Sequence, residues 1–137
     1  MCYFLYGAVN DGISIEQYNK VIQNSKYHFN IGNNQDVNSS IGSSEYRITS
    51  CYCDCNTPIG EKLENNQNLD DLKDFEKLLN KLRSVRGIKH IYLSKNWCLE
   101  ANVKEETVHI DDIDPLSYLA NIEENCLYKI QLYKWHY

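Results

Sequence analysis

The chain has 137 residues, with 14 Lys and Arg against 19 Asp and Glu, which gives a net charge of −5 at pH 7. This acidic balance argues against general nucleic-acid binding, which needs a basic face to displace counterions from the phosphates. No apolar run approaches the roughly 20 residues of a membrane span, and the first residues lack the basic segment of a signal peptide. We therefore expect one cytoplasmic domain over residues 1–137, without membrane association and with six reduced cysteines.

In the first half of the chain, apolar segments alternate with turn-forming residues. Residues 2–8 are apolar on both faces, which predicts a central strand, and residues 27–31 and 46–53 are predicted to form the next two strands. Ser14 and Gln17 have the spacing of a capping box, so a helix with one buried face is expected after Ser14. The polar residues 32–44 offer little to bury and are expected to form a mobile loop.

The second half contains the longest predicted helix, which begins after Asn68 as its N-cap and ends near Gly87. Asp114 before Pro115 predicts the start of another helix, since proline tolerates the first helical position. The other expected segments are a helical turn at 57–58, a polar connection at 61–67, a strand at 88–93, a loop at 94–103, a short strand at 108–110 and a closing strand at 127–135.

This order of elements defines the expected fold class. Strand, helix, strand, strand, helix and strand follow one another, with a helix and a strand appended. That is the βαββαβ order of ferredoxin-like folds. We therefore expect a single α+β domain with a mostly antiparallel sheet and helices on one face.

Three of the six cysteines lie within five residues, at Cys51, Cys53 and Cys55. In an extended conformation all three thiols would point to the same face, because side chains alternate along a strand. No cofactor is expected, but zinc is the ion that such a row could hold, with Cys98 as one candidate for a fourth ligand. The alternative interpretation is that Cys51 and Cys53 are small buried core residues.

Other residues are candidates for catalysis. Cys2 would be activated by its own α-amine if Met1 were removed, as in N-terminal nucleophiles. His109 and Asp111 share a face of an extended segment and would suit a general acid and base pair. In the alternative interpretation, His109 is a surface residue at the end of a strand, and Asp111 is a carboxylate placed before the start of a helix, where negative charge is favourable. A redox role of the thiol row is disfavoured because Asp54, between Cys53 and Cys55, opposes a thiolate.

Four basic residues are candidates for binding a phosphate group: Arg83, Arg86, Lys89 and Lys95. The alternative is that they form a solvated basic end of the long helix, where positive charge complements the helix dipole. The sequence leaves both interpretations open.

Taken together, these features favour a small acidic binding module, an inhibitor or adaptor that docks on a larger protein partner. The abundance of Tyr supplies the amphipathic side chains of such surfaces, and the richness in Asn, Lys, Ile and Tyr suggests an AT-rich bacterial or mobile-element source. The alternative is a thiol- or metal-dependent hydrolase or transferase built on Cys51, Cys53, Cys55 and His109. The two differ in whether these groups converge in one cleft.

Overall fold

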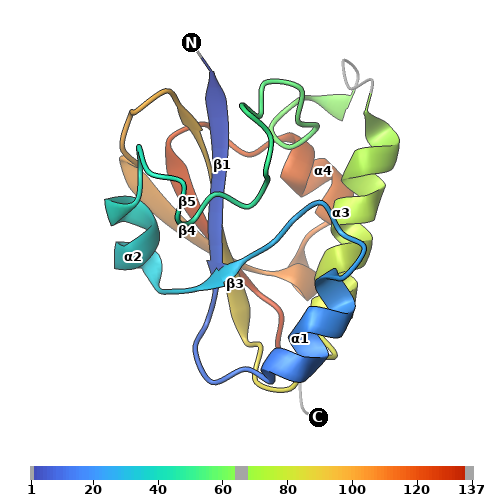
Figure 1. Ribbon diagram of the computed structural model, residues 1–137. Coiled ribbons are helices and arrows are strands. Elements are labelled where there is room, and N and C mark those ends of the chain that lie inside the picture. The colour runs from blue at the N-terminus through green and yellow to red at the C-terminus, as the bar shows by residue number, and fades with distance from the viewer. Residues whose placement is uncertain (1, 64–67, 135–137) are drawn as a thin grey trace.

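The computed structural model describes residues 2–63 and 68–134, which form one small α+β domain around a five-stranded sheet (Figure 1). The strands are β1 (Tyr3–Val9), β2 (Asn30–Ile31), β3 (His90–Trp97), β4 (Lys104–His109) and β5 (Cys126–Gln131). The helices in this part of the chain are α1 (Ile15–Ile22), α2 (Asn34–Ser39), α3 (Leu69–Leu82) and α4 (Pro115–Ala120), with a 3-10 turn η2 (Ile110–Asp112). None of these helices has both the length and the apolar character needed to cross a bilayer.

The sheet has the strand order β2-β1-β3-β5-β4 and is mixed. Strand β3 runs antiparallel to both of its neighbours, β1 and β5, whereas the two edge strands β2 and β4 run parallel to the strands beside them. The expected α+β class is thus confirmed, but the mostly antiparallel, ferredoxin-like arrangement is not. The connection from β4 through α4 to β5 explains the parallel edge, since a helix between two strands returns the chain in the same direction.

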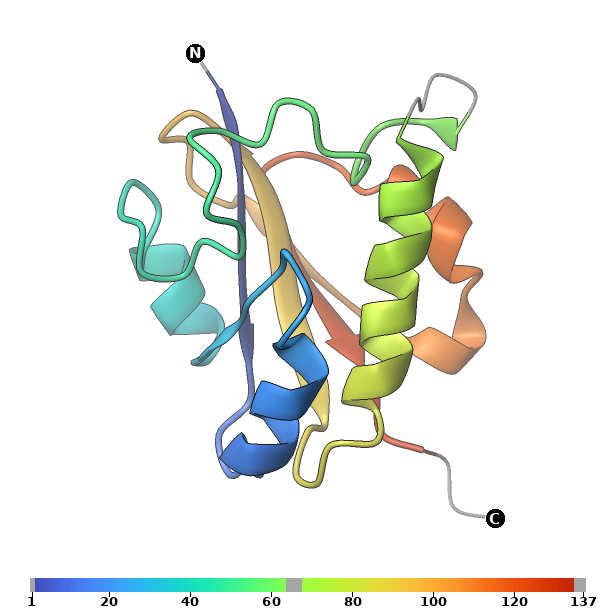
Figure 2. The same cartoon turned by 45° about the vertical axis from the view of Figure 1, so that its right-hand side comes forward.

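Helices cover both faces of the sheet, not one face as expected. Figure 2 shows α1, α3 and α4 on one face and α2 on the other. The larger core lies under the three helices and includes Leu72, Phe75 and Leu79 of α3. A smaller core on the opposite face gathers side chains of β1, β3 and β5 around Val37 of α2. The central strands are therefore buried on both faces, as expected for residues 2–8.

Residues 32–44 contain a packed helix in place of the expected mobile loop. Asn33 caps α2 in a complete capping box with Asp36, which satisfies the first backbone N–H groups of the helix. Val37 is fully buried against the sheet. Ile41, which follows the helix, packs against the same core, so two apolar residues and the cap hold this segment on the sheet.

Residues 46–53 do not form the expected strand, although they follow the outer edge of β1. Tyr6 and Arg47 make an isolated antiparallel bridge. Further along, the N–H of Leu5 donates to the carboxylate of Asp54 at 2.8 Å and not to a backbone carbonyl. Because a side chain replaces the backbone partner there, the ladder stops and the chain continues as a loop.

Helix termini also differ from the expectation. Ser14 accepts the N–H of Gln17 as predicted, but the Gln17 side chain accepts the N–H of Arg86, so the capping box is only half formed. Ile15, expected on the buried face of α1, is 52% exposed. Gly87 has a positive φ of 91° but lies beyond the C-cap of α3, in a turn that packs closely against Gly12.

The strands of the second half are longer or shorter than expected. β3 continues through residues 94–97 because its buried Ser94 and Asn96 satisfy each other, the Ser94 hydroxyl donating to Asn96 Oδ1 at 2.7 Å. β4 begins at Lys104 and not at 108, and its charged residues are typical of an exposed edge strand. Of the expected strands, 27–31 pairs only at Asn30–Ile31. The expected strand at 127–135 ends at Gln131, and its Trp135 lies outside the described residues, as do residues 64–67 of the expected connection.

Candidate functional site

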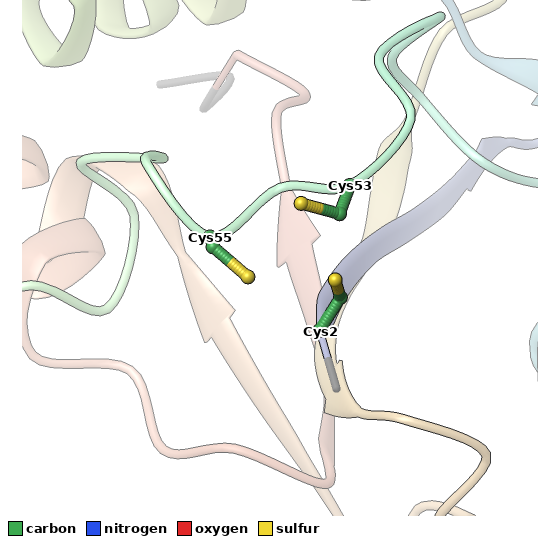
Figure 3. Close-up of side chains that lie close together, drawn as sticks. All are labelled: Cys2, Cys53 and Cys55. Carbon is green, nitrogen blue, oxygen red and sulfur yellow. The ribbon is translucent and has the colours of Figure 1, made fainter.

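The thiols of Cys2, Cys53 and Cys55 converge at the start of β1 (Figure 3). Their three Sγ atoms lie within 4.8 Å of one another. Cys2 directly precedes β1, whereas the other two belong to the loop that follows the edge of this strand. In Figure 3 the sulfur atoms point into the space between the loop and the strand. We call these three residues the thiol cluster.

Asp54 holds the loop in place from the inside. It is buried, and its N–H donates to the Tyr3 carbonyl at 2.9 Å while its carboxylate accepts the N–H of Leu5. The carboxylate also pairs with Arg47 at 3.0 Å and accepts the Thr49 hydroxyl at 2.5 Å. Four partners thus fix the residue between the two loop cysteines, which brings both of their thiols toward the start of β1.

The cluster distributes its protons unevenly. The pKa of Cys53 is lowered, first because the backbone N–H of Cys55 donates to its sulfur, and then because the thiols of Cys2 and Cys55 donate to it as well. The pKa of Cys2 is raised to about 11, chiefly by its hydrogen bond to Cys53 and then by burial. Asp54 opposes the Cys53 thiolate only weakly, and its carboxylate is already paired with Arg47. A thiolate in this cluster therefore resides on Cys53.

The expected row of Cys51, Cys53 and Cys55 is divided by the fold. Cys51 is exposed and lies outside the thiol cluster, because the loop is not an extended strand. The alternative that Cys51 and Cys53 are buried core residues is wrong too, since Cys53 is only partly buried. Cys98 is tied to Cys2 through the backbone, its N–H donating to the Cys2 carbonyl at 2.7 Å, yet its thiol is not in the cluster.

A cleft opens beside Cys53, between the loop and the start of α3. Its volume is about 410 Å³, within the range of small-molecule pockets. Its lining includes the polar side chains of Lys26, Thr49, Asn68 and Asp71. Of the cluster, Cys53 borders the cleft, while Cys2 and Cys55 are not in its lining. Cys53, whose thiol has the lowered pKa, is thus the residue of the cluster that borders the cleft.

His109 and Asp111 lie at the other end of the sheet. His109 pairs with Gln131 of β5, which in turn pairs with His90 at the start of β3. Cys2 precedes Tyr3, which pairs with Trp97 at the opposite end of β3. His109 is buried and not the surface residue that one alternative expected; its ring nitrogens contact the Tyr133 carbonyl and the Asp111 N–H. The structure thus does not bring His109 to the thiols.

The four phosphate candidates do not form one pocket. The guanidinium of Arg83 is bound to both carboxylate oxygens of Asp111 at 2.8 Å. Arg86 and Lys89 are exposed nearby, at the end of the sheet opposite the thiols. Lys95 lies inside the domain, where burial lowers its pKa and its ammonium donates to the Ile59 carbonyl. The arrangement favours separate structural roles over a common phosphate site.

Comparison with known proteins gives no further information on this site. No family model, no curated protein and no solved structure matches the chain. The functional argument therefore rests on the geometry of the thiol cluster and the cleft beside it.

The sequence points to the cysteines of the cluster but not to their grouping or to the residues that support it. Cys2 and the loop cysteines lie about 50 residues apart in the sequence, and nothing local indicates that these two segments meet. Arg47 has no role in the sequence argument, and Asp54 enters it only as a charge that opposes a thiolate, not as the residue that anchors the loop. The one available signal is an acidic residue between two cysteines with an arginine seven positions earlier, which predicts a local ion pair.

Proposed function

We propose that the protein is a small binding module whose ligand is a thiophilic metal ion, held by Cys2, Cys53 and Cys55. The observation that carries this proposal is the convergence of three thiols from two distant segments. Thiolates are the ligands that zinc and other soft ions prefer in proteins. The proposal keeps binding as the mode of action. Among the candidate metal ligands, Cys2 takes the place of Cys51.

The distances suit such an ion with little movement. A zinc–sulfur bond of about 2.3 Å in a tetrahedral site separates neighbouring sulfur atoms by about 3.8 Å. The three Sγ atoms are at most 4.8 Å apart, so a shift of about 1 Å would close the site. Three protein ligands leave one position open for water or for a group from a bound partner. Since the thiols must lose their protons, binding should strengthen as the pH rises.

Metal analysis of protein purified without a His tag and under reducing conditions tests this proposal. We expect about one zinc or other thiophilic ion per chain after exposure to the metal, and a thiolate-to-metal absorption band with cobalt as a substitute. Cys53→Ser should lose the ion. Cys51→Ser is the matched control, because this exposed cysteine is close in sequence but outside the cluster. Equal retention in both variants, or no uptake by the wild type, would contradict the proposal.

A second candidate function, docking on a protein partner, is favoured by exposed apolar side chains near the thiols. Tyr52, between two of the loop cysteines, is 93% exposed, and Leu99 and Val103 in the turn after β3 are 73% and 83% exposed. That turn begins at Cys98, whose backbone N–H donates a hydrogen bond to the Cys2 carbonyl. Exposed aromatic and aliphatic side chains that gather at one end of a molecule are typical of interaction surfaces.

The docking candidate requires a partner identified by cross-linking and then tested as a purified protein. Tyr52→Ser should weaken direct binding about tenfold or more, as expected for an aromatic anchor. Ile15→Ser is the control, because Ile15 is also an exposed aliphatic residue but follows the opposite end of β1. If both variants bind the partner as the wild type does, this surface is not the docking site.

A further inference from the structure

We propose that the metal-free thiol cluster carries out thiol–disulfide exchange on a small polar disulfide bound in the cleft, with Cys53 as the attacking thiol and Cys2 as the resolving thiol. This activity goes beyond metal binding and needs no ion. It uses two observations together: the convergence of the three sulfur atoms, and the cleft, which Cys53 borders and Cys2 and Cys55 do not.

Access selects the attacking thiol. Cys53 borders the cleft of about 410 Å³, so a disulfide bound there would lie beside this residue. Cys2 and Cys55 are not in the lining of the cleft, and their sulfur atoms lie within 4.8 Å of that of Cys53. Cys51 also borders the cleft, but it has no second thiol of the cluster beside it. Only Cys53 combines contact with the cleft and a neighbouring thiol.

The resolving thiol follows from ring geometry. A disulfide between Cys53 and Cys55 would close across one intervening residue, where the required separation of the two Cβ atoms and the S–S torsion are difficult to reach. Cys2 comes from a separate segment and is held at the start of β1 by the hydrogen bond from Cys98. A bond between Cys2 and Cys53 therefore closes a long loop without the strain of a short ring.

The exchange balances without another reactant. The Cys53 thiolate attacks one sulfur of the substrate disulfide, forming a mixed disulfide and releasing the other half as a thiolate. The Cys2 thiol then gives its proton to this released thiolate or to solvent, and its sulfur attacks Cys53. The second half leaves as a thiolate, which takes up a proton. One substrate disulfide is reduced to two thiols, and the protein is oxidised to the Cys2–Cys53 disulfide.

The lining of the cleft indicates the chemical class of the substrate. Lys26 offers an ammonium and Asp71 a carboxylate, paired with each other at 2.9 Å, and Thr49 and Asn68 add a hydroxyl and an amide. Groups of both charges and neutral donors suit a zwitterionic, peptide-like molecule. We therefore assign one half of a small zwitterionic disulfide, of the kind represented by glutathione disulfide, to this cleft.

The experiment exposes reduced, full-length protein to glutathione disulfide and follows the adducts by mass spectrometry of the intact chain and its peptides. The wild type should pass to an internal Cys2–Cys53 disulfide. The Cys2 thiol, at an effective concentration of about 1 mM or more, should attack the mixed disulfide about tenfold faster than about 0.1 mM free thiol would. Cys2→Ser should instead accumulate one glutathione on Cys53. Cys55→Ser should still form the internal disulfide, and Cys98→Ser should behave as the wild type, because this cysteine is in neither the thiol cluster nor the lining of the cleft.

The reaction is run with and without a chelator, while circular dichroism reports that each variant is folded. A bound ion would slow the reaction only in the absence of chelator, so failure of the metal proposal leaves this result intact. Modification of Cys51 as fast as Cys53 would overturn the inference, because exposure alone would then decide reactivity. A Cys2→Ser protein that forms no adduct on Cys53, or a wild type without the internal disulfide, would overturn it as well.

Discussion

Replacement of Asp54 by alanine should destabilise the protein strongly, because this buried carboxylate has partners on two segments. The change leaves the N–H of Leu5 without its acceptor and Arg47 without its counter-ion. The Arg47 side chain is only 14% exposed, so water cannot fully replace the lost carboxylate. Breaking a buried ion pair by removing one partner costs about 3 to 5 kcal/mol. Total stabilities of such domains are about 5 to 15 kcal/mol, so the loss would be a large fraction.

Urea unfolding followed by far-ultraviolet circular dichroism in the presence of a reductant measures this loss. With a slope of about 2 kcal/mol per molar urea, the midpoint of Asp54→Ala should fall by about 2 M. Asp54→Asn can still accept the N–H of Leu5 and should lose less, about 1.5 to 3 kcal/mol, since only the charged interaction is removed. Asp112→Ala, at an exposed aspartate of η2, is the control and should stay within about 0.5 kcal/mol of the wild type.

A double-mutant cycle separates the ion pair from the rest. Arg47→Met and Asp54→Ala, combined, should cost less than the sum of the single losses by about 1 to 3 kcal/mol, because the second change removes a group that the first has already left unpaired. Strictly additive losses, or a loss below about 1 kcal/mol for Asp54→Ala, would refute the view that this pair anchors the loop.

Three further predictions concern other parts of the molecule. Val37→Ala should lower the free energy of unfolding by about 2 kcal/mol in urea titrations, since the valine is fully buried; no change would mean that α2 does not pack as described. Alkylation at pH 7, quantified by peptide mass spectrometry, should modify Cys53 faster than Cys2, because the pKa of the first thiol is lowered and that of the second is raised to about 11; the reverse order would contradict the proton distribution. Hydrogen bonds from Arg83 hold the pKa of Asp111 below its usual range, so this carboxylate stabilises the fold above its unfolded pKa and loses that effect as the pH falls through the folded pKa. Asp111→Asn should therefore unfold at lower urea than the wild type at pH 7, and the difference should shrink as the pH falls through the lowered pKa of Asp111 in the folded protein.

The elements that the sequence predicts correctly are those with a strong local signal. The apolar strand at 2–8 is β1, the spaced leucines and Phe75 give α3, and Asp114 before Pro115 marks the start of α4. Each depends on a periodicity or a cap that neighbouring residues determine. These elements therefore form close to the positions that the sequence pattern predicts.

The elements that the sequence misses depend on distant partners. α2 contains one buried apolar residue, Val37, so no periodicity indicates its packing. The loop at 46–53 has a strand-like composition, and only the bond from Leu5 to Asp54 shows why its ladder stops. The edge position of β4 is likewise determined by parallel pairing with β5, which residues far along the chain decide.

The candidate site depends on the same interruption of the sheet edge. Had the loop continued as a strand, Cys53 and Cys55 would lie on one face about 6.6 Å apart, since each residue advances about 3.3 Å. That spacing is too wide for two ligands of one ion or for two sulfur atoms in exchange. Because Asp54 takes the place of a backbone partner on β1, the two thiols come within 4.8 Å of each other and of Cys2. Loss of Asp54 should therefore weaken metal binding and the reactivity of Cys53 together, even though Asp54 is neither a proposed metal ligand nor one of the reacting thiols.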